Sequence, residues 1–164
     1  MGIKKVGVHP HQTMKFPPDG EIIFREWAIN TPIITSVCGT RIATRLPRDA
    51  GMPFLVLFRS GGSLLNPRSE AHIQNALLPM ECYAGRWGGN DDTAVPDYGE
   101  AMNLANTIIQ SAFNYSNGYI QSSDGLKAKI YSFDIIQMPT RIEETTTGLG
   151  RYAIALSMTY RDAS

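Results

Sequence analysis

The sequence has few of the residues from which metal sites, disulfide frameworks and common catalytic sites are built. Its 164 residues include only two cysteines and three histidines. Cys38 and Cys82 lie far apart in the chain, so we expect both to be reduced and buried. His9 and His11 have no cysteine or carboxylate at the spacing of a metal site, and His72 stands alone. We therefore expect no metal and no cofactor.

Short motifs of catalysis and phosphate binding are also absent. The chain has no Gly-x-Ser-x-Gly, no Cys-x-x-Cys and no Gly-x-x-x-x-Gly-Lys sequence. The acidic pairs are Asp91-Asp92 and Glu143-Glu144, but adjacent side chains of an extended chain point apart, so neither pair alone makes a shared carboxylate site. The sequence thus predicts a protein that is not an enzyme. A substrate pocket around His72 is the enzymatic alternative.

The chain has no excess of either charge sign and no long apolar run. Lys+Arg and Asp+Glu both number 15. Proteins dedicated to nucleic-acid binding usually carry a basic excess, because neutralising phosphates supplies much of their affinity. No apolar run approaches the length of a membrane span, and none follows the basic N-terminus as in a signal peptide. We expect no membrane partner, no free nucleic acid as main ligand, and synthesis in a reducing cytoplasm.

Charge is nevertheless distributed unevenly along the chain. Residues 1–90 hold ten basic and six acidic side chains, whereas residues 91–164 hold five and nine. Opposite faces of one subunit could then attract each other in a head-to-tail ring. Scattered, solvated surface charges are the alternative interpretation.

Hydrophobic periodicity predicts one α+β domain over residues 19–164, preceded by an arm over 1–18 that three prolines interrupt. Apolar residues at three- and four-residue steps predict one helix over about 20–30 and another from 93–96 to 113. Five strands are predicted, at residues 40–46, 53–59, 77–84, 126–138 and 151–161. We expect a mostly antiparallel four- to five-stranded sheet with two helices packed on one face.

Several residues predict how these elements are placed. Residues 53–59 show no polar alternation, which is typical of a central strand covered on both faces. Pro79 favours an edge or bulge position for the third strand. Pro96 fits the first turn of the second helix. The last two strands are expected to be antiparallel neighbours. The connection between them, residues 139–150, is longer than the loop of a β-hairpin.

Five segments, taken in order, resemble a known family. They are "GTRIATRLP", "PFLVLFRSGG", "ECYAG", "DYGEAMNLANTIIQSAF" and "GRYAIALSMTYR". Together they are similar to the tail terminator proteins of long-tailed, siphovirus-type bacteriophages of actinobacteria, over about residues 20–161. The resemblance implies a structural virion protein that forms a ring, expected to be hexameric, at the head-proximal end of the tail tube.

The resemblance also implies partners. The ring would end polymerisation of the tail tube protein and offer the surface that joins the head-tail connector protein. The chain would be made in the host cytoplasm, and genomic DNA would pass through the ring without specific binding. Another neck or tail component, either a head-completion protein or the tube subunit, is the closest alternative. A small cytoplasmic adaptor that recognises its partner with residues 139–150 is another.

The sequence suggests which residues could serve such a ring. Arginine forms bidentate pairs with carboxylates across interfaces, so we expect subunit contacts at Arg41, Arg45, Arg59, Arg86 and the adjacent Trp87. No aromatic platform is interleaved with these arginines, as single-stranded nucleic acid would require. We expect Arg59→Ala to impair ring formation while the subunit stays folded, unless Arg59 is merely a surface residue at a strand end.

Acidic side chains are the candidates for the channel wall. Negative or neutral walls avoid holding the phosphates of passing DNA. The second half of the chain carries the acidic excess, and its two acidic pairs are the candidates. We therefore predict that Asp91, Asp92, Glu143 and Glu144 face the channel.

Overall fold

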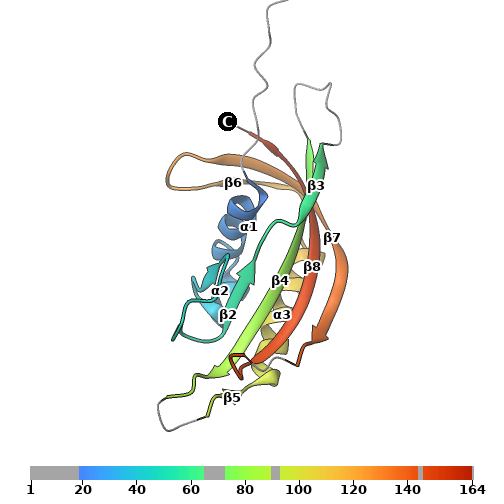
Figure 1. Cartoon of the computed structure of the whole chain (residues 1–164). Helices are drawn as coiled ribbons and strands as arrows, with labels where there is room; N and C mark the ends of the chain where they lie inside the picture. Colours follow the sequence, from blue (N-terminus) through green and yellow to red (C-terminus); the bar gives the residue numbers. More distant parts are fainter. Residues whose placement is uncertain (1–18, 65–72, 90–92, 144–145, 164) are drawn as a thin grey trace, which may run out of the picture.

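The computed structural model of the chain describes residues 19–64, 73–89, 93–143 and 146–163. The predicted arm over 1–18 lies outside the described residues. Helices cover one face of a curled, mostly antiparallel sheet (Figure 1). The elements are α1 Gly20–Ile29, α2 Pro32–Cys38, β1 Ile42–Ala43, β2 Phe54–Leu57, β3 Gly61–Leu64, β4 Gln74–Arg86, β5 Val95–Pro96, α3 Tyr98–Phe113, β6 Gly118–Gln121, β7 Lys127–Arg141 and β8 Gly150–Asp162. The predicted single α+β domain with a mostly antiparallel sheet is confirmed.

The predicted four to five strands and two helices are too few. Within the described residues the sheet has eight strands in the order β1-β2-β4-β8-β7-β6, with β3 and β5 also paired to β4. α2 has seven residues, and β1, β3, β5 and β6 have two to four each. Segments this short carry too few periods for a pattern to show. The strand predicted at 40–46 is correct only for Ile42–Ala43, and the chain continues as a loop.

Pro79 was predicted to lie at an edge or bulge of the sheet. The structure places it in an interior strand instead. β4 is an interior strand, paired with β8 on one side and with β2 and β3 on the other. The carbonyl of Pro79 accepts a hydrogen bond of 3.3 Å from the N–H of Phe58, just after β2 ends. An antiparallel residue directs its N–H and C=O to the same neighbour. The missing N–H of Pro79 therefore falls where the β2 ladder stops and the chain bends toward β3.

Both faces of β2 are covered, as its unbroken apolar run predicted. Leu55 and Leu57 belong to the main core between the sheet and the helices. Phe54 and Val56 face the opposite way and join a smaller cluster, packed against side chains of the loop 44–53. This second cluster fixes the loop to one end of the sheet.

Side-chain caps define where the two longer helices begin. The Asp19 carboxylate accepts a bond of 3.0 Å from the N–H of Glu21 in α1. The Asp97 carboxylate accepts one of 2.9 Å from the N–H of Glu100 in α3. α3 therefore begins at Tyr98, and Pro96 lies in β5 instead of in the first helical turn.

β7 and β8 form a long, curved antiparallel pair, as predicted (Figure 1). The side chains of β8 that alternate toward the helices are almost fully buried; these are Ile154, Leu156, Met158 and Tyr160. β7 extends to Arg141, so the connection to β8 is shorter than the predicted 139–150. Register shifts beside Tyr131, Ile136 and Met138 interrupt the β7 ladder.

We predict opposite effects for two glycines that occupy the first turns of α1 and α3. A Cβ at Gly20 would lie 2.8 Å from the Cβ of Ala76 on β4, so Gly20→Ala should push α1 off the sheet and cost about 1–3 kcal/mol. At Gly99 the nearest atom is 3.5 Å away, so Gly99→Ala should be neutral or stabilise by up to about 1 kcal/mol. Urea denaturation of both variants measures the difference, and equal midpoints would contradict it.

Candidate subunit interface

Most of the predicted contact residues lie in or beside the loop 44–53 and the end of β4. The end of β4 and β5 form the lower end of the domain in Figure 1. The loop 44–53, the end of β4 and β5 meet there. Arg41, Arg45, Arg86 and Trp87 all belong to this end. Asp91, Asp92, Glu144 and His72 lie outside the described residues.

Arg41 and Trp87 hold the loop 44–53 in place. Arg41 Nε donates a hydrogen bond of 2.9 Å to the carbonyl of Pro53, and Trp87 Nε1 donates one of 2.8 Å to the carbonyl of Ala50. Both side chains are partly buried, so each has a role inside the domain. The sequence predicted contacts between copies for these two residues. Their role in the loop was missed because an irregular loop has no periodicity by which it can be recognised. Arg45 and Arg86 are exposed.

Arg59 lies at the other end of β2 and is not brought together with the other arginines. Its N–H donates to the Glu21 carboxylate of α1, and its Nε donates to the carbonyl of Gly61 at 3.1 Å. These bonds connect α1 to the turn between β2 and β3. A role for Arg59 in ring formation stays a prediction, and its side chain is already bonded within its own turn.

Glu143 is part of a surface cluster with Arg141 and Tyr98. Its carboxylate lies 2.9 Å from Arg141 Nη2 and accepts a bond of 3.2 Å from the Tyr98 hydroxyl. The Arg141 guanidinium also stacks on the Tyr98 ring, 3.6 Å from its centre. The ion pair is solvent-exposed and therefore contributes little stability. It does offset the charge of Glu143, so the predicted channel residue is not an isolated acid.

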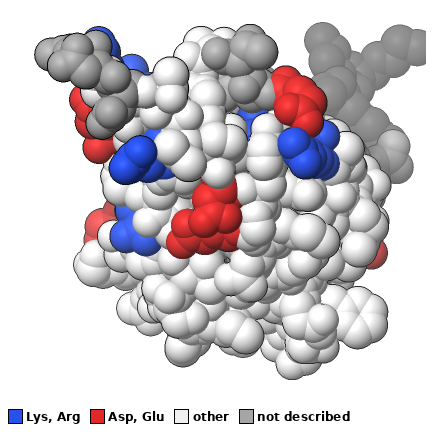
Figure 2. Space-filling model, turned by 90° about the horizontal axis from the view of Figure 1, so that it is seen from below, with Lys and Arg blue, Asp and Glu red and all other residues white. Residues whose placement is uncertain are grey.

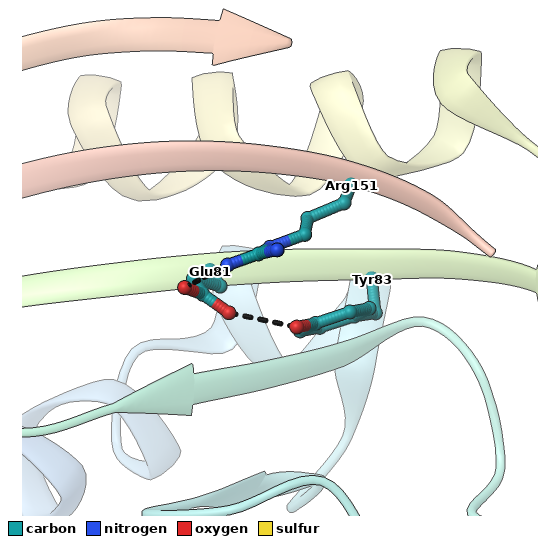
Figure 3. A network of polar contacts seen from close by, with 3 residues as sticks. All are labelled: Glu81, Tyr83 and Arg151. Carbon is teal, nitrogen blue, oxygen red and sulfur yellow. Dashed lines mark hydrogen bonds and ion pairs between the residues drawn. The ribbon is translucent and has the colours of Figure 1, made fainter. Parts of the chain in front are cut away.

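A polar network on the helix-free face of the sheet was missed by sequence reasoning (Figure 3). Arg151 of β8 forms an ion pair with Glu81 of β4, and the Tyr83 hydroxyl donates to the other Glu81 oxygen at 2.7 Å. Only about a fifth of each charged side chain is exposed (21% and 23%). The alternation of side chains along β4 could have predicted that Glu81 and Tyr83 lie on one face of the sheet. The sequence could not have predicted that Arg151 joins them, because this contact depends on the register of β4 with β8.

The lower end combines both signs of charge with polar groups. Figure 2 shows acidic and basic side chains mixed on the half of this view that also carries the grey atoms, whereas the other half is almost entirely white. A shallow groove of about 710 Å³ lies here, lined among others by Arg48, Asp49, Trp87 and Thr147. Such a surface suits hydrogen bonds and ion pairs with a partner protein, as at the rim of an interface.

Within the described parts of the chain, no group of three or more His, Cys, Asp or Glu side chains could hold a metal ion. None of the helices described is long and apolar enough to cross a membrane. Comparison with protein-family models found no match for this chain. Comparison with curated protein sequences found none either.

We predict that Trp87→Phe loosens the loop 44–53. The substitution keeps an aromatic ring but removes the donor to Ala50, at a cost of about 1 kcal/mol. Trypsin should then cut after the exposed Arg45 and Arg48 several-fold faster, as followed by mass spectrometry. Tyr119→Phe, on β6, is the control and should leave these rates unchanged. Equal cleavage of Trp87→Phe and wild type would show that the bond does not hold the loop.

A double-mutant cycle should detect the Glu81–Arg151 pair in stability measurements. Because both side chains are mostly buried, Arg151→Met should cost about 1–3 kcal/mol by leaving Glu81 without its ion-pair partner. Adding Glu81→Gln to Arg151→Met should recover part of that loss, giving a coupling of about 1 kcal/mol or more in urea denaturation. Strictly additive effects would mean that the pair contributes nothing.

Proposed function

We propose that the chain is a tail terminator, a subunit of a ring at the head-proximal end of a long-tailed bacteriophage tail. In this role the ring, expected to be hexameric, stops polymerisation of the tail tube protein and offers the surface for the head-tail connector protein. DNA passes through it without specific binding. The chain performs no catalysis and needs no cofactor in this function.

The proposal depends above all on where the resembling segments lie in the fold. "GTRIATRLP" contains β1, "PFLVLFRSGG" contains β2, "ECYAG" is the end of β4, and "GRYAIALSMTYR" is most of β8. These strands are neighbours in the order β1-β2-β4-β8, and the segment with α3 packs against β4 and β8. Segments from both ends of the sequence thus form one continuous unit, which supports treating them as a single family pattern.

The surface properties also favour a structural role over the alternatives. Arg45 and Arg86 remain exposed at the lower end, and Glu143 lies on the surface with Arg141. A neutral chain with a mixed polar end suits contacts with other proteins more than binding of free nucleic acid. A tube subunit or head-completion protein would use similar surfaces, so position in the particle is the decisive property.

Immunogold electron microscopy locates the chain in the virion. Antibody raised against the purified chain is applied to intact particles of the phage that encodes it. The proposal expects gold at the head-proximal end of the tail only. Gold along the whole tail would identify a tube subunit, and gold at the head vertex of tailless heads a head-completion protein. No gold on particles opened at the neck would favour the adaptor or enzyme alternatives.

A second prediction concerns tube growth in vitro. Adding the purified chain to polymerising tail tube protein should shorten the tubes in proportion to its concentration, because a bound ring blocks further addition. Tube lengths are measured by negative-stain microscopy, with heat-denatured chain as the control. Tubes of unchanged length, or tubes containing the chain throughout, would contradict a terminator.

A further inference from the structure

Two long stretches of the sequence carry no charge and form one side of the domain. Residues 27–40 and 101–123 contain no Asp, Glu, Lys, Arg or His. They include α2, nearly all of α3 and β6, and α2 packs against α3. Charged side chains normally cover exposed helices, whereas the centres of protein interfaces are depleted of charge and enriched in aromatic residues. An exposed side without charge therefore indicates a contact surface.

A groove lies within this uncharged side. It has a volume of about 640 Å³ and lies between the α1–α2 junction, the end of α3 and β6, and none of the described residues that line it is charged. Three large apolar side chains are exposed in or beside it: Ile33 at 55%, Phe113 at 73% and Tyr119 at 68%. We refer to these three residues as the helical patch. Such exposed apolar residues around a groove are typical of a protein-binding surface.

A second uncharged patch lies on the outer edge of β7. β6 pairs with β7 only as far as Ile130, and no other described strand pairs with β7 on that edge. Residues 135–140 carry no charge, and Ile136 and Met138 are 58% and 60% exposed. We refer to these two residues as the edge patch.

The edge patch suits contact through side chains more than the addition of a strand. Ile136 and Met138 lie at register shifts in the β7 ladder, which bend an edge away from regular pairing. Pro139 also lacks an N–H to donate to a further strand. Both apolar side chains are more than half exposed, so they are accessible to a partner.

The two patches lie on different sides of the molecule. In Figure 1, α2 lies on the left of the domain and the lower part of β7 on the right. If two different patches on opposite sides meet, each copy contacts a preceding and a following copy, and the assembly closes into a ring when the rotation allows. Both patches are uncharged, so their contact buries no unpaired charge.

We propose that the edge patch of one copy docks in the groove of the helical patch of the next copy, so that the chain assembles head to tail. The inference specifies which surfaces of the proposed ring meet. That the head-to-tail assembly closes into a ring rests on the proposed function. It places the main contact away from the predicted arginine positions and assigns Ile136 and Met138 as the apolar groups that enter the groove.

Charge introduced into either patch tests the proposal. Ile33→Asp disrupts the helical patch, and Asp in the first turn of α2 suits the helix N-terminus. Met138→Asp disrupts the edge patch. The matched control is Ile22→Asp on α1, where the isoleucine is 50% exposed and outside both patches. Circular dichroism and urea denaturation verify that each variant is folded.

Sedimentation velocity over a concentration series gives the readout. We expect wild type and Ile22→Asp to associate beyond a dimer, and Ile33→Asp and Met138→Asp each to associate at least tenfold more weakly. An equimolar mixture of the two patch variants should form one-to-one dimers, because each supplies one intact patch. Unchanged association of either patch variant, or a mixture without dimers, overturns the proposal.

Crosslinking tests the contact even where association is weak. Ile33→Cys and Met138→Cys are mixed and treated with a short bismaleimide. The native Cys38 and Cys82 are fully buried, and burial raises the pKa of both thiols, so they stay protonated and protected. We expect dimers from the mixture and few from either variant alone. A mixture giving no more dimer than Ile22→Cys with Met138→Cys overturns the proposal.

The two proposals fail in distinguishable ways. Gold confined to the head end of the tail, together with no crosslinks between the patches, overturns the docking and leaves the terminator standing. Crosslinks between the patches, with gold along the whole tail, support the docking and overturn the terminator.

Discussion

The rest of the structure depends on the antiparallel pairing of β4 with β8. This pairing runs from Gln74 opposite Tyr160 to Ala84 opposite Gly150. The other described strands attach to β4 or β8 directly, or through β2 and β7. β2, β3 and β5 pair with β4, and β7 pairs with β8. The same two strands present alternating apolar side chains to α3, so one register positions both the sheet and its main helix. A shift by one residue would turn these side chains to solvent.

That pairing also creates the difference between the two faces of the sheet. The face toward the helices is apolar and closed. The opposite face brings Glu81, Tyr83 and Arg151 together, and Asn75 donates to Ser157 at 2.6 Å. These polar pairs satisfy one another across β4 and β8, which lets this face remain without a helix. The ends and sides of the domain are therefore accessible while its core stays closed.

Charge is concentrated in some parts of the surface and missing from others, and the two kinds of surface suit different contacts. The lower end mixes acids and bases, which favours reversible or oriented contacts with a different protein. The uncharged helical side and the β7 edge favour a tighter contact in which apolar groups are removed from water. The proposed ring subunit would need both kinds, because it would hold identical neighbours and also meet two different partners along the tail axis.

The sequence by itself determined the α+β class, the presence of α1 and α3, the covered β2 and the pairing of β7 with β8, because hydrophobic periodicity is set by residues close together in the chain. It could not show α2 or the shortest strands, which are stabilised mainly by their neighbours and carry little pattern of their own. Only the tertiary structure decided that Pro79 lies inside the sheet, that Arg41 and Trp87 serve a loop, and that Arg151 meets Glu81. Each of these depends on strand order and register, which join residues far apart in the chain and leave no local signal.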